Sequence, residues 1–103
     1  MILKANPTRS KAYRDFVKSL PCCGCGAPAD DPHHIIDCEL GVMMGGKSSD
    51  VHTIPLCRKC HDLLHYNVRG WEIHHGDQAT HVLKTQIKAE AAGILPKVFQ
   101  EAT

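Results

Sequence analysis

The sequence has 103 residues, 43% of them hydrophobic, and a formal net charge of +1. This length predicts one domain whose small core gives little margin of stability, so a bound metal ion would help to hold the fold. The charge lacks the strong basic excess that is usual in dedicated nucleic-acid-binding domains. No apolar stretch has the roughly 20 residues that span a bilayer, and no signal peptide is recognisable, so we expect a cytoplasmic protein without a membrane partner.

The first predicted element is a basic N-terminal arm and helix, residues 1–20. Ser10 can cap a helix that runs to about Leu20, because Tyr13, Phe16 and Val17 lie on the same apolar stripe. Against a single acid, this segment carries five cations: Lys4, Arg9, Lys11, Arg14 and Lys18. The arm can contact phosphates, although a solvated helix face explains the same charges equally well.

The middle segment, residues 21–75, is predicted to form the core. A Gly-, Pro- and Asp-rich turn is followed by short strands over 34–36 and 51–56, with the loop GVMMGGKSSD between them. The run RKCHDLLHY predicts a helix over 58–66, which Asn67 and Gly70 close. Trp71 and Ile73 are expected to pack as an apolar return segment.

The last segment, residues 76–103, predicts a helix that packs on the core. Asp77 is placed to cap this helix. Apolar residues recur in it at helical spacing until Pro96: Val82, Leu83, Ile87, Ala91 and Leu95. The whole order predicts an α+β fold, a small core with a helix at each end.

Two Cys-x-x-Cys pairs stand thirty-one residues apart: Cys22 and Cys25, then Cys57 and Cys60. Two such knuckles can converge on one tetrahedral ion, and four thiolates are the ligands that zinc prefers in closed structural sites. The pattern therefore predicts one structural Zn²⁺. Disulfide or redox pairs are the alternative, which the intracellular character of the chain disfavours. Cys23 can compete with its neighbour as a ligand, whereas Cys38 is expected to be a small buried thiol.

Five of the eight histidines stand in an order that one further metal site can explain. His33 and His34 are adjacent in a strand, so their side chains point to opposite sides and can take different roles. His61 and His65 lie four residues apart on the predicted helix and can bind one ion together. His52 lies in the second strand, before the second knuckle. Each alone is more often an ordinary surface or core histidine, but their combination with a knuckle indicates a site.

The runs DPHHI, GGKSSD, IPLCRKCH and LLH resemble the HNH (ββα-metal) endonucleases, and within them the bacteriophage recombination-enhancement (Ref-like) nucleases. The resemblance covers about residues 22–71, roughly half of the chain. It implies a small ββα-metal core, the His-Me finger, with a Cys₄ zinc knuckle pair and flanking helices. It also implies a phage- or prophage-encoded DNA endonuclease that hydrolyses phosphodiester bonds and is linked to DNA recombination or processing.

Carried over residue by residue, the resemblance makes His33 and His61 ligands of a catalytic ion, with His65 as the candidate for the third ligand. Asp37 and Asp50 are alternative ligands, although such acids are more often turn caps or solvated charges. The ion would be Mg²⁺, Mn²⁺ or Ni²⁺, and Zn²⁺ can fill the same site because it binds imidazole well.

The resemblance makes His34 the general base that activates water. An unperturbed imidazole titrates near neutrality, and a backbone carbonyl can orient its Nδ1. His52 stands where the superfamily usually has Asn, so it would orient the base or brace the loop. The implied partner is DNA, recognised mainly through its backbone and groove shape. Arg58, Lys59 and Arg69 can then contact phosphates, although ordinary solvated charges explain each of these cations equally well.

Two further interpretations stay open. The chain can be a zinc-knuckle module that binds DNA or protein and cuts no bond; His34 then has no structural purpose. Met43, Met44 and the final helix can form a dimerisation surface, although loop packing explains the methionines more simply. The sequence thus allows a monomer or a homodimer, and a recombinase or other phage or host DNA-processing protein as a second partner.

Overall fold

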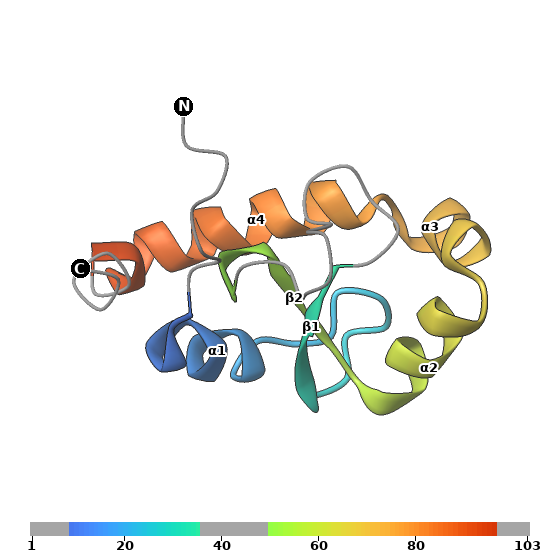
Figure 1. Ribbon diagram of the computed structural model, residues 1–103, viewed down its shortest axis with the longest axis horizontal. Coiled ribbons are helices and arrows are strands. Elements are labelled where there is room, and N and C mark those ends of the chain that lie inside the picture. Colours follow the sequence, from blue (N-terminus) through green and yellow to red (C-terminus); the bar gives the residue numbers. More distant parts are fainter. Residues whose placement is uncertain (1–8, 36–49, 97–103) are drawn as a thin grey trace.

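The computed structural model describes residues 9–35 and 50–96 (Figure 1). The elements in chain order are α1 (Lys11–Lys18), β1 (Asp31–His34), the 3₁₀ helix η1 (Asp50–His52), β2 (Thr53–Leu56), α2 (Arg58–Tyr66), α3 (Val68–His75) and α4 (Gln78–Ala91). The fold is therefore mixed α+β, with one two-stranded sheet among several helices. Cys38, Met43 and Met44 lie outside the described residues.

The two strands are antiparallel, with His33 opposite Ile54 and His34 opposite Thr53. The predicted first strand, 34–36, was misplaced, because pairing begins three residues earlier, at Asp31. The prediction was based on the apolar pair Ile35 and Ile36. The strand that actually pairs with β2 consists mainly of polar residues. β2 begins two residues after the predicted start, and all four of its residues are buried. It forms the centre of the fold.

Helix α1 confirms the prediction of a short amphipathic helix. The Ser10 hydroxyl accepts a hydrogen bond from the Tyr13 backbone amide, at 3.1 Å, and caps the first turn. Tyr13 and Val17 are fully buried and form a small cluster with Ala89 of α4. The N-terminal and C-terminal helices therefore contact each other.

Helix α2 has the predicted bounds, but the return segment predicted after it was wrong. Residues 68–75 form α3, because Asn67 ends one helix and caps the next, its side chain accepting from the Gly70 amide at 3.0 Å. Trp71 is buried in the core, whereas Ile73 is 81% exposed. The extra helix explains why only one of these two apolar residues packs inside.

Helix α4 follows Asp77 as predicted, although the Asp77 side chain makes no capping hydrogen bond. The predicted apolar stripe is confirmed only in part, because Val82 is buried and Leu95 packs against the core, whereas Leu83 and Ile87 are 57% and 59% exposed. The buried face is instead largely polar: Gln78, His81, Val82, Thr85 and Ala89. Hydrogen bonds compensate for this burial, since His81 Nε2 lies 2.6 Å from the His75 carbonyl and Thr85 donates to the His81 carbonyl.

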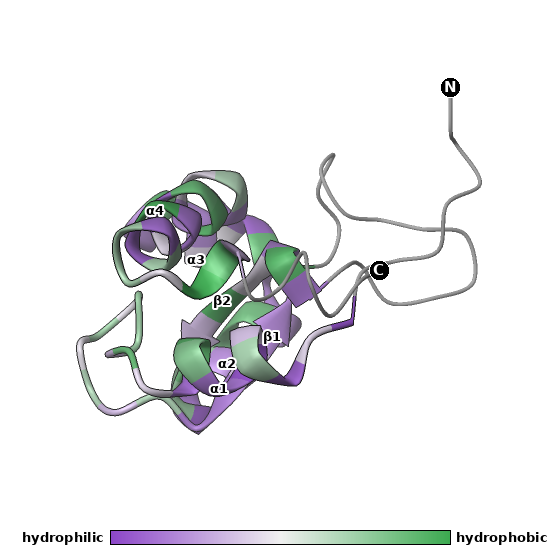
Figure 2. Cartoon of the chain, turned by 90° about the vertical axis from the view of Figure 1, so that its left-hand side faces the viewer, coloured by the Kyte–Doolittle hydropathy of each residue, from purple (hydrophilic) through white to green (hydrophobic). Residues whose placement is uncertain are grey.

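The elements are arranged around the sheet. Helix α4 runs along one long side of the molecule, with α1 at one end of the other side and α2 and α3 at the opposite end (Figure 1). Seen along α4, the sheet lies between α4 and α1 (Figure 2). The main core cluster contains residues of both knuckles and of β2, α2, α3 and α4: Cys22, Ile35, Ile54, Leu56, Cys57, Cys60, Leu64, Trp71 and Val82. None of the described helices is both long and apolar enough to cross a membrane.

Candidate metal centres and active site

The four cysteines of the two knuckles come together, as their spacing predicted. Their sulfur atoms all lie within 4.8 Å of one another, and Cys25 Sγ is 3.6 Å from Cys57 Sγ. We call these four residues, Cys22, Cys25, Cys57 and Cys60, the cysteine group. No described cysteine forms a disulfide. The group is thus a set of four free thiols at metal-binding distance.

Backbone N–H groups donate to one sulfur atom in each knuckle. The Gly24 amide donates to Cys22 Sγ at 3.3 Å, and the Cys60 amide donates to Cys57 Sγ at the start of α2. Burial alone would raise the pKa of Cys22, but backbone N–H groups outweigh it and bring that pKa down to about 7. Burial, together with neighbouring sulfurs, raises the pKa of Cys60. A divalent cation would relieve this repulsion, so the donor set fits a bound metal.

Cys23 lies outside the cysteine group. Its side chain packs, partly buried, against the main core cluster. Burial is the main cause that raises the pKa of this thiol to about 12, so it is protonated at neutral pH. The predicted competition between Cys23 and its neighbours for the ion is therefore not supported by its position.

Gly24 lets the first knuckle approach the core. A Cβ at this position would lie 2.9 Å from Cys60 Sγ and 3.0 Å from Cζ2 of Trp71, which is closer than real Cβ contacts. Both neighbours are buried, so they have little room to move. The absence of a side chain is what allows the two knuckles and Trp71 to pack together.

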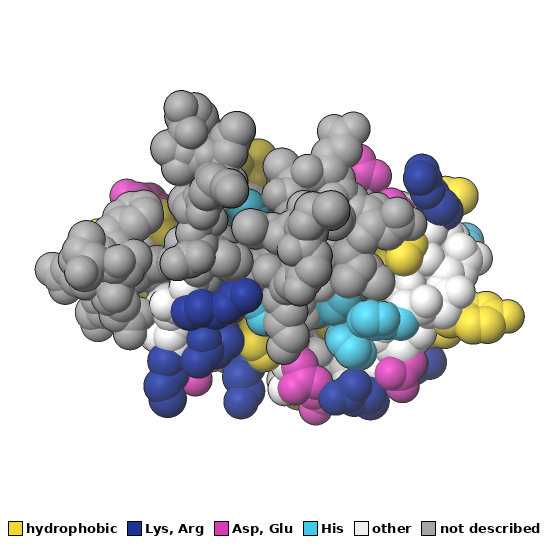
Figure 3. Space-filling view, in the orientation of Figure 1, with side chains coloured by type: hydrophobic (Ala, Val, Ile, Leu, Met, Phe, Trp, Pro, Cys, Tyr) yellow, Lys and Arg dark blue, Asp and Glu magenta, His cyan; other side chains and the backbone are white. Residues whose placement is uncertain are grey.

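The three histidines predicted as ligands also come together. His33 lies in β1, and His61 and His65 lie one turn apart on α2. Their ligand atoms all lie within 4.8 Å of one another, and we call them the histidine group. His33 is buried, His61 is half-buried and His65 is exposed. Because His65 is exposed, the group is open to solvent on one side, and Figure 3 shows histidine side chains at the molecular surface.

His33 is the buried member of this group, and among residues 9–35 and 50–96 its Nε2 has no hydrogen-bond partner. Burial, and then the neighbouring His61 and His65, lower its pKa to about 3. Burial likewise lowers the pKa of His61. Neutral imidazoles with an unsatisfied buried nitrogen fit a metal ion, which would accept the lone pair and remove the cost of the unpaired atom.

Gln78 of α4 hydrogen-bonds the buried His33 side chain, and the sequence did not predict this contact. This first residue of α4 is fully buried and hydrogen-bonds the His33 side chain. Its amide nitrogen and its backbone N–H both approach Glu72 Oε2, at 3.4 and 3.0 Å. Helix α4 therefore helps to fix the ring orientation of the buried histidine. The one sequence signal is that Gln78 stands four residues before Val82, on the buried face.

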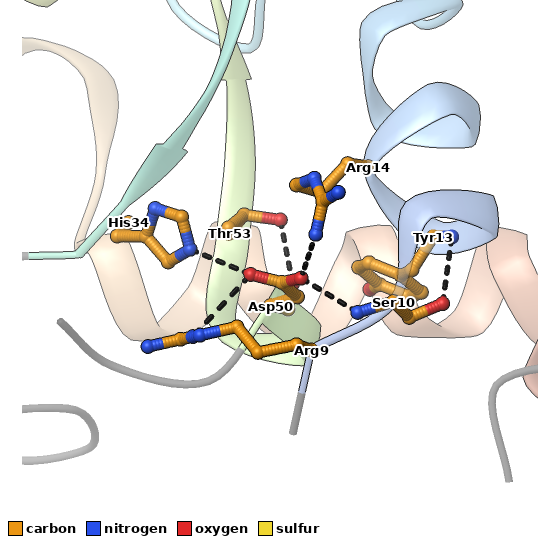
Figure 4. Close-up of polar contacts among 7 residues, drawn as sticks. All are labelled: Arg9, Ser10, Tyr13, Arg14, His34, Asp50 and Thr53. Atoms are coloured by element: carbon orange, nitrogen blue, oxygen red, sulfur yellow. Dashed lines mark hydrogen bonds and ion pairs between the residues drawn. The ribbon is translucent and has the colours of Figure 1, made fainter. Parts of the chain in front are cut away.

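His34 points away from the histidine group, as strand alternation predicted. Its Nε2 lies 2.8 Å from Asp50 Oδ1 (Figure 4). The orienting group is thus a carboxylate at Nε2, which corrects the expected backbone carbonyl at Nδ1. Asp50, an alternative metal ligand in the sequence, contacts His34 instead, and Asp37 lies outside the described residues.

Asp50 is buried, with its side chain 1% exposed, and it joins His34 to the basic arm. It accepts hydrogen bonds from the Ser10 amide at 2.7 Å, from Arg14 at 2.5 Å and from Arg9 at 3.4 Å. Burial would raise the pKa of Asp50, but the bonds from Ser10, His34 and Arg14 outweigh it and lower that pKa. Local sequence patterns carry no signal of these long-range contacts.

The structure places His52 in η1, half-buried, and burial lowers its pKa. Its backbone carbonyl accepts from the Ile35 amide at 3.4 Å, which extends the pairing of the strands. Within residues 9–35 and 50–96, its side chain joins neither the histidine group nor the His34–Asp50 pair. Its expected catalytic role stays a prediction.

Arg58 lies beside the histidine group. Its guanidinium is 2.6 Å from Asp31 and 3.3 Å from His61 Nδ1. Its side chain is 59% exposed, so the guanidinium borders the open side of the group. Lys59 and Arg69, the other predicted phosphate contacts, are exposed on α2 and α3.

Comparison with known proteins gives the family of the chain. Residues 2–93 match the family described as "Protein of unknown function (DUF968)". The chain is similar to "Uncharacterized protein YdfU" of Escherichia coli (strain K12), with 42% identity over 83 residues. That match covers 81% of this chain but 24% of the relative, so the chain spans about a quarter of the relative's length. No solved structure matches the chain significantly. Because the family match covers nearly the whole sequence, the chain belongs to the DUF968 family.

Proposed function

We propose that the chain is a metal-dependent DNA endonuclease of the HNH type. The observation that carries this proposal is the histidine group, in which the buried Nε2 of His33 has no partner among the described residues and two more imidazoles lie within ligand distance. Its exposed side leaves positions for water and a phosphate oxygen, as a catalytic ion requires. A chain that used only the cysteine group to hold its fold would have no need of this second donor set.

We infer that the cysteine group holds a structural Zn²⁺. Four sulfur ligands from two knuckles are the usual donor set of closed zinc sites. In this arrangement the zinc would tie the segment before β1 to the start of α2. It would therefore fix the distance between His33 on the strand and His61 on the helix. The structural ion would support the second site without taking part in the reaction.

In the proposed reaction, Mg²⁺, Mn²⁺, Ni²⁺ or Zn²⁺ in the histidine group would supply charge stabilisation for the phosphate and the departing 3′ oxygen. His34 acts as the general base for water. Arg58 is placed to contact a phosphate at the edge of the group. The exposed lysines of α1 can contact the DNA backbone further along. A cytoplasmic location, a recombinase partner and a link to recombination stay predictions from the sequence.

The test is cleavage of supercoiled plasmid and of single-stranded DNA by the zinc-loaded chain. We expect nicked or linear products with Mg²⁺, Mn²⁺ or Ni²⁺ and none with a chelator that spares the zinc. His65→Ala should abolish metal-stimulated cleavage. His34→Gln keeps a side-chain N–H for Asp50 but removes the base, so cleavage should fall by about 10² to 10⁴-fold.

The matched control is His74→Ala, which removes an exposed histidine of α3 outside both groups. It should cleave like the native chain. If His34→Gln also cleaved at the native rate, the assignment of the base would be wrong. Absence of cleavage by the native chain on every DNA form and metal, with DNA binding retained, would favour the zinc-knuckle binding module.

A further inference from the structure

Asp50 collects donors from two distant parts of the chain. Its Oδ2 accepts from the Ser10 amide and Arg14, and its Oδ1 lies 2.8 Å from His34 Nε2 and 3.4 Å from Arg9 (Figure 4). The two guanidiniums and the amide offset the cost of burying this carboxylate. Ser10 and Arg14, which lie at the start of α1 and within it, both donate to Oδ2, so the anchoring of the helix itself does not require the contact from Oδ1 to His34. The contact from Oδ1 to His34 therefore needs a separate explanation.

The backbone around Asp50 is held independently of His34. The Thr53 hydroxyl donates to the Asp50 carbonyl at 2.8 Å, and Gln86 of α4 donates to the Val51 carbonyl at 2.7 Å. Both contacts fix η1, the short helix that carries Asp50. The carboxylate is thus positioned by β2 and α4 and presents Oδ1 to His34 from a rigid support.

An ionised carboxylate can only accept hydrogen bonds, so its partner nitrogen on His34 must carry the proton. In a neutral imidazole the other nitrogen, Nδ1, then has the free lone pair. In the part of the chain that the structure describes, no hydrogen bond reaches His34 Nδ1, and the side chain is 18% exposed. Figure 4 shows this second ring nitrogen turned away from Asp50.

We propose that Asp50 is a positioning residue that holds His34 in the tautomer protonated at Nε2, so that Nδ1 is the nitrogen that takes a proton from water. This inference rests on the proposed nuclease function for its use of the base. The water oxygen forms a bond to phosphorus, its proton moves to Nδ1, and the bond from phosphorus to the 3′ oxygen breaks. The 3′ oxygen then takes a proton from solvent water, and the proton that His34 releases from Nδ1 neutralises the hydroxide left behind and restores the base.

Asp50 does not receive the proton in this scheme. Two guanidiniums and a backbone amide already stabilise its negative charge, so it is a weak base. Its negative charge instead stabilises the imidazolium that forms on His34, as an orienting carboxylate does in other histidine-based sites. Asp50 therefore links Arg9 and Arg14 of the basic arm to His34.

The first test reads the tautomer directly and needs no enzymatic activity. Long-range proton–nitrogen NMR spectra of the nitrogen-15-labelled, zinc-loaded chain separate protonated from bare ring nitrogens, and His34→Gln identifies the His34 signals. We expect a protonated Nε2 and a bare Nδ1 in the native chain at neutral to mildly alkaline pH. A protonated Nδ1 would overturn the proposal, whether or not the chain cleaves DNA.

The second test uses Asp50→Asn, whose carboxamide can donate as well as accept. We expect a mixed or reversed tautomer of His34, and a loss of kcat of about 10- to 100-fold with KM for DNA little changed. Arg14→Gln is the matched control, because it alters the ionic surroundings of Asp50 but leaves the contact between Asp50 and His34. In this variant the His34 tautomer should be the same as in the native chain. Native kcat in a folded Asp50→Asn chain would overturn the proposal.

The two tests separate the possible failures. If the native chain has the expected tautomer but cleaves no DNA, the nuclease function is wrong and the positioning of His34 by Asp50 still holds. If the native chain cleaves DNA but His34 carries its proton on Nδ1, the positioning role is wrong. Should Asp50→Asn fail to fold, the tautomer of the native chain decides.

Discussion

The five described thiols differ in their hydrogen bonds and in their burial. Cys22 and Cys57 each accept a hydrogen bond from a backbone N–H group, whereas Cys23 packs against the apolar core. Adjacent residues in the sequence thus have opposite chemical character. This difference gives a matched pair of substitutions for testing the structural metal.

We predict that Cys57→Ser removes the bound zinc and the cooperative thermal transition, because a structural ion supplies folding free energy in a chain of this size. Cys23→Ser should keep one zinc per chain and lower Tm only slightly, since it changes a partly buried contact. Elemental analysis and thermal melting check both results. Zinc content and Tm that are equal in the two variants would contradict the assignment.

Helix α1 carries two kinds of cation. Arg14, with Arg9 before the helix, faces the buried Asp50, whereas Lys11 and Lys18 are exposed. Lys11 pairs with Asp15 at 2.7 Å, but an exposed pair of this kind contributes little to stability. The lysines are therefore the cations of α1 that can be changed without disturbing the fold.

We predict that changing Lys11 and Lys18 together to Gln weakens DNA binding and reduces the slope of log K against log salt by up to about 2, since each neutralised phosphate adds about 0.9 to that slope. Tm should stay native. Lys84 and Lys88 of α4, changed in the same way, are the control and should leave the slope unaltered. An equal effect of both double variants on the slope would mean that α1 makes no specific contact with DNA.

The sequence predicted most elements but not how they meet. Helix α1 was predictable because Ser10 and an apolar stripe are local signals, and the convergence of the two groups of candidate ligands because the spacing of their residues reflects Cys-x-x-Cys turns and one helical turn. Helix α3 was missed because Asn67 both ends α2 and caps α3. The roles of Gln78 and Asp50 depend on partners that tertiary packing brings to them, which no local pattern encodes.

At the scale of the whole molecule, the fold lowers the pKa of one buried imidazole, His33, and of two half-buried imidazoles, His52 and His61. His33 has its pKa lowered to about 3 by burial and then by His61 and His65, against an ordinary value of 6.5. Burial also lowers the pKa of His52 and, with other causes, that of His61. Between pH 6.5 and about 3 the unfolded chain therefore binds protons that the folded chain does not.

We predict that the contribution of these neutral imidazoles to the free energy of unfolding is fully present above about pH 6.5. It falls as the pH drops towards about 3, because the unfolded state gains these protons. The free energy of unfolding of His33→Gln should fall less steeply with decreasing pH. His74→Gln, at an exposed position, should show the same pH dependence as the native chain. The urea midpoint, measured for the three zinc-loaded proteins over this pH range, checks the difference. Equal pH dependence in all three would mean that His33 is not held neutral by the fold.

The contact between Gly24 and Trp71 also gives the chain an internal optical reporter. Trp71 is the single tryptophan and is 4% exposed, and its buried indole nitrogen has no hydrogen-bond partner in the part of the chain that the structure describes. Its ring lies against the first knuckle and 4.8 Å from the His75 ring. Loosening of the knuckle would admit water to the indole and shift its fluorescence emission to the red. The state of the cysteine group can thus be followed without a label, in the intact chain and in real time.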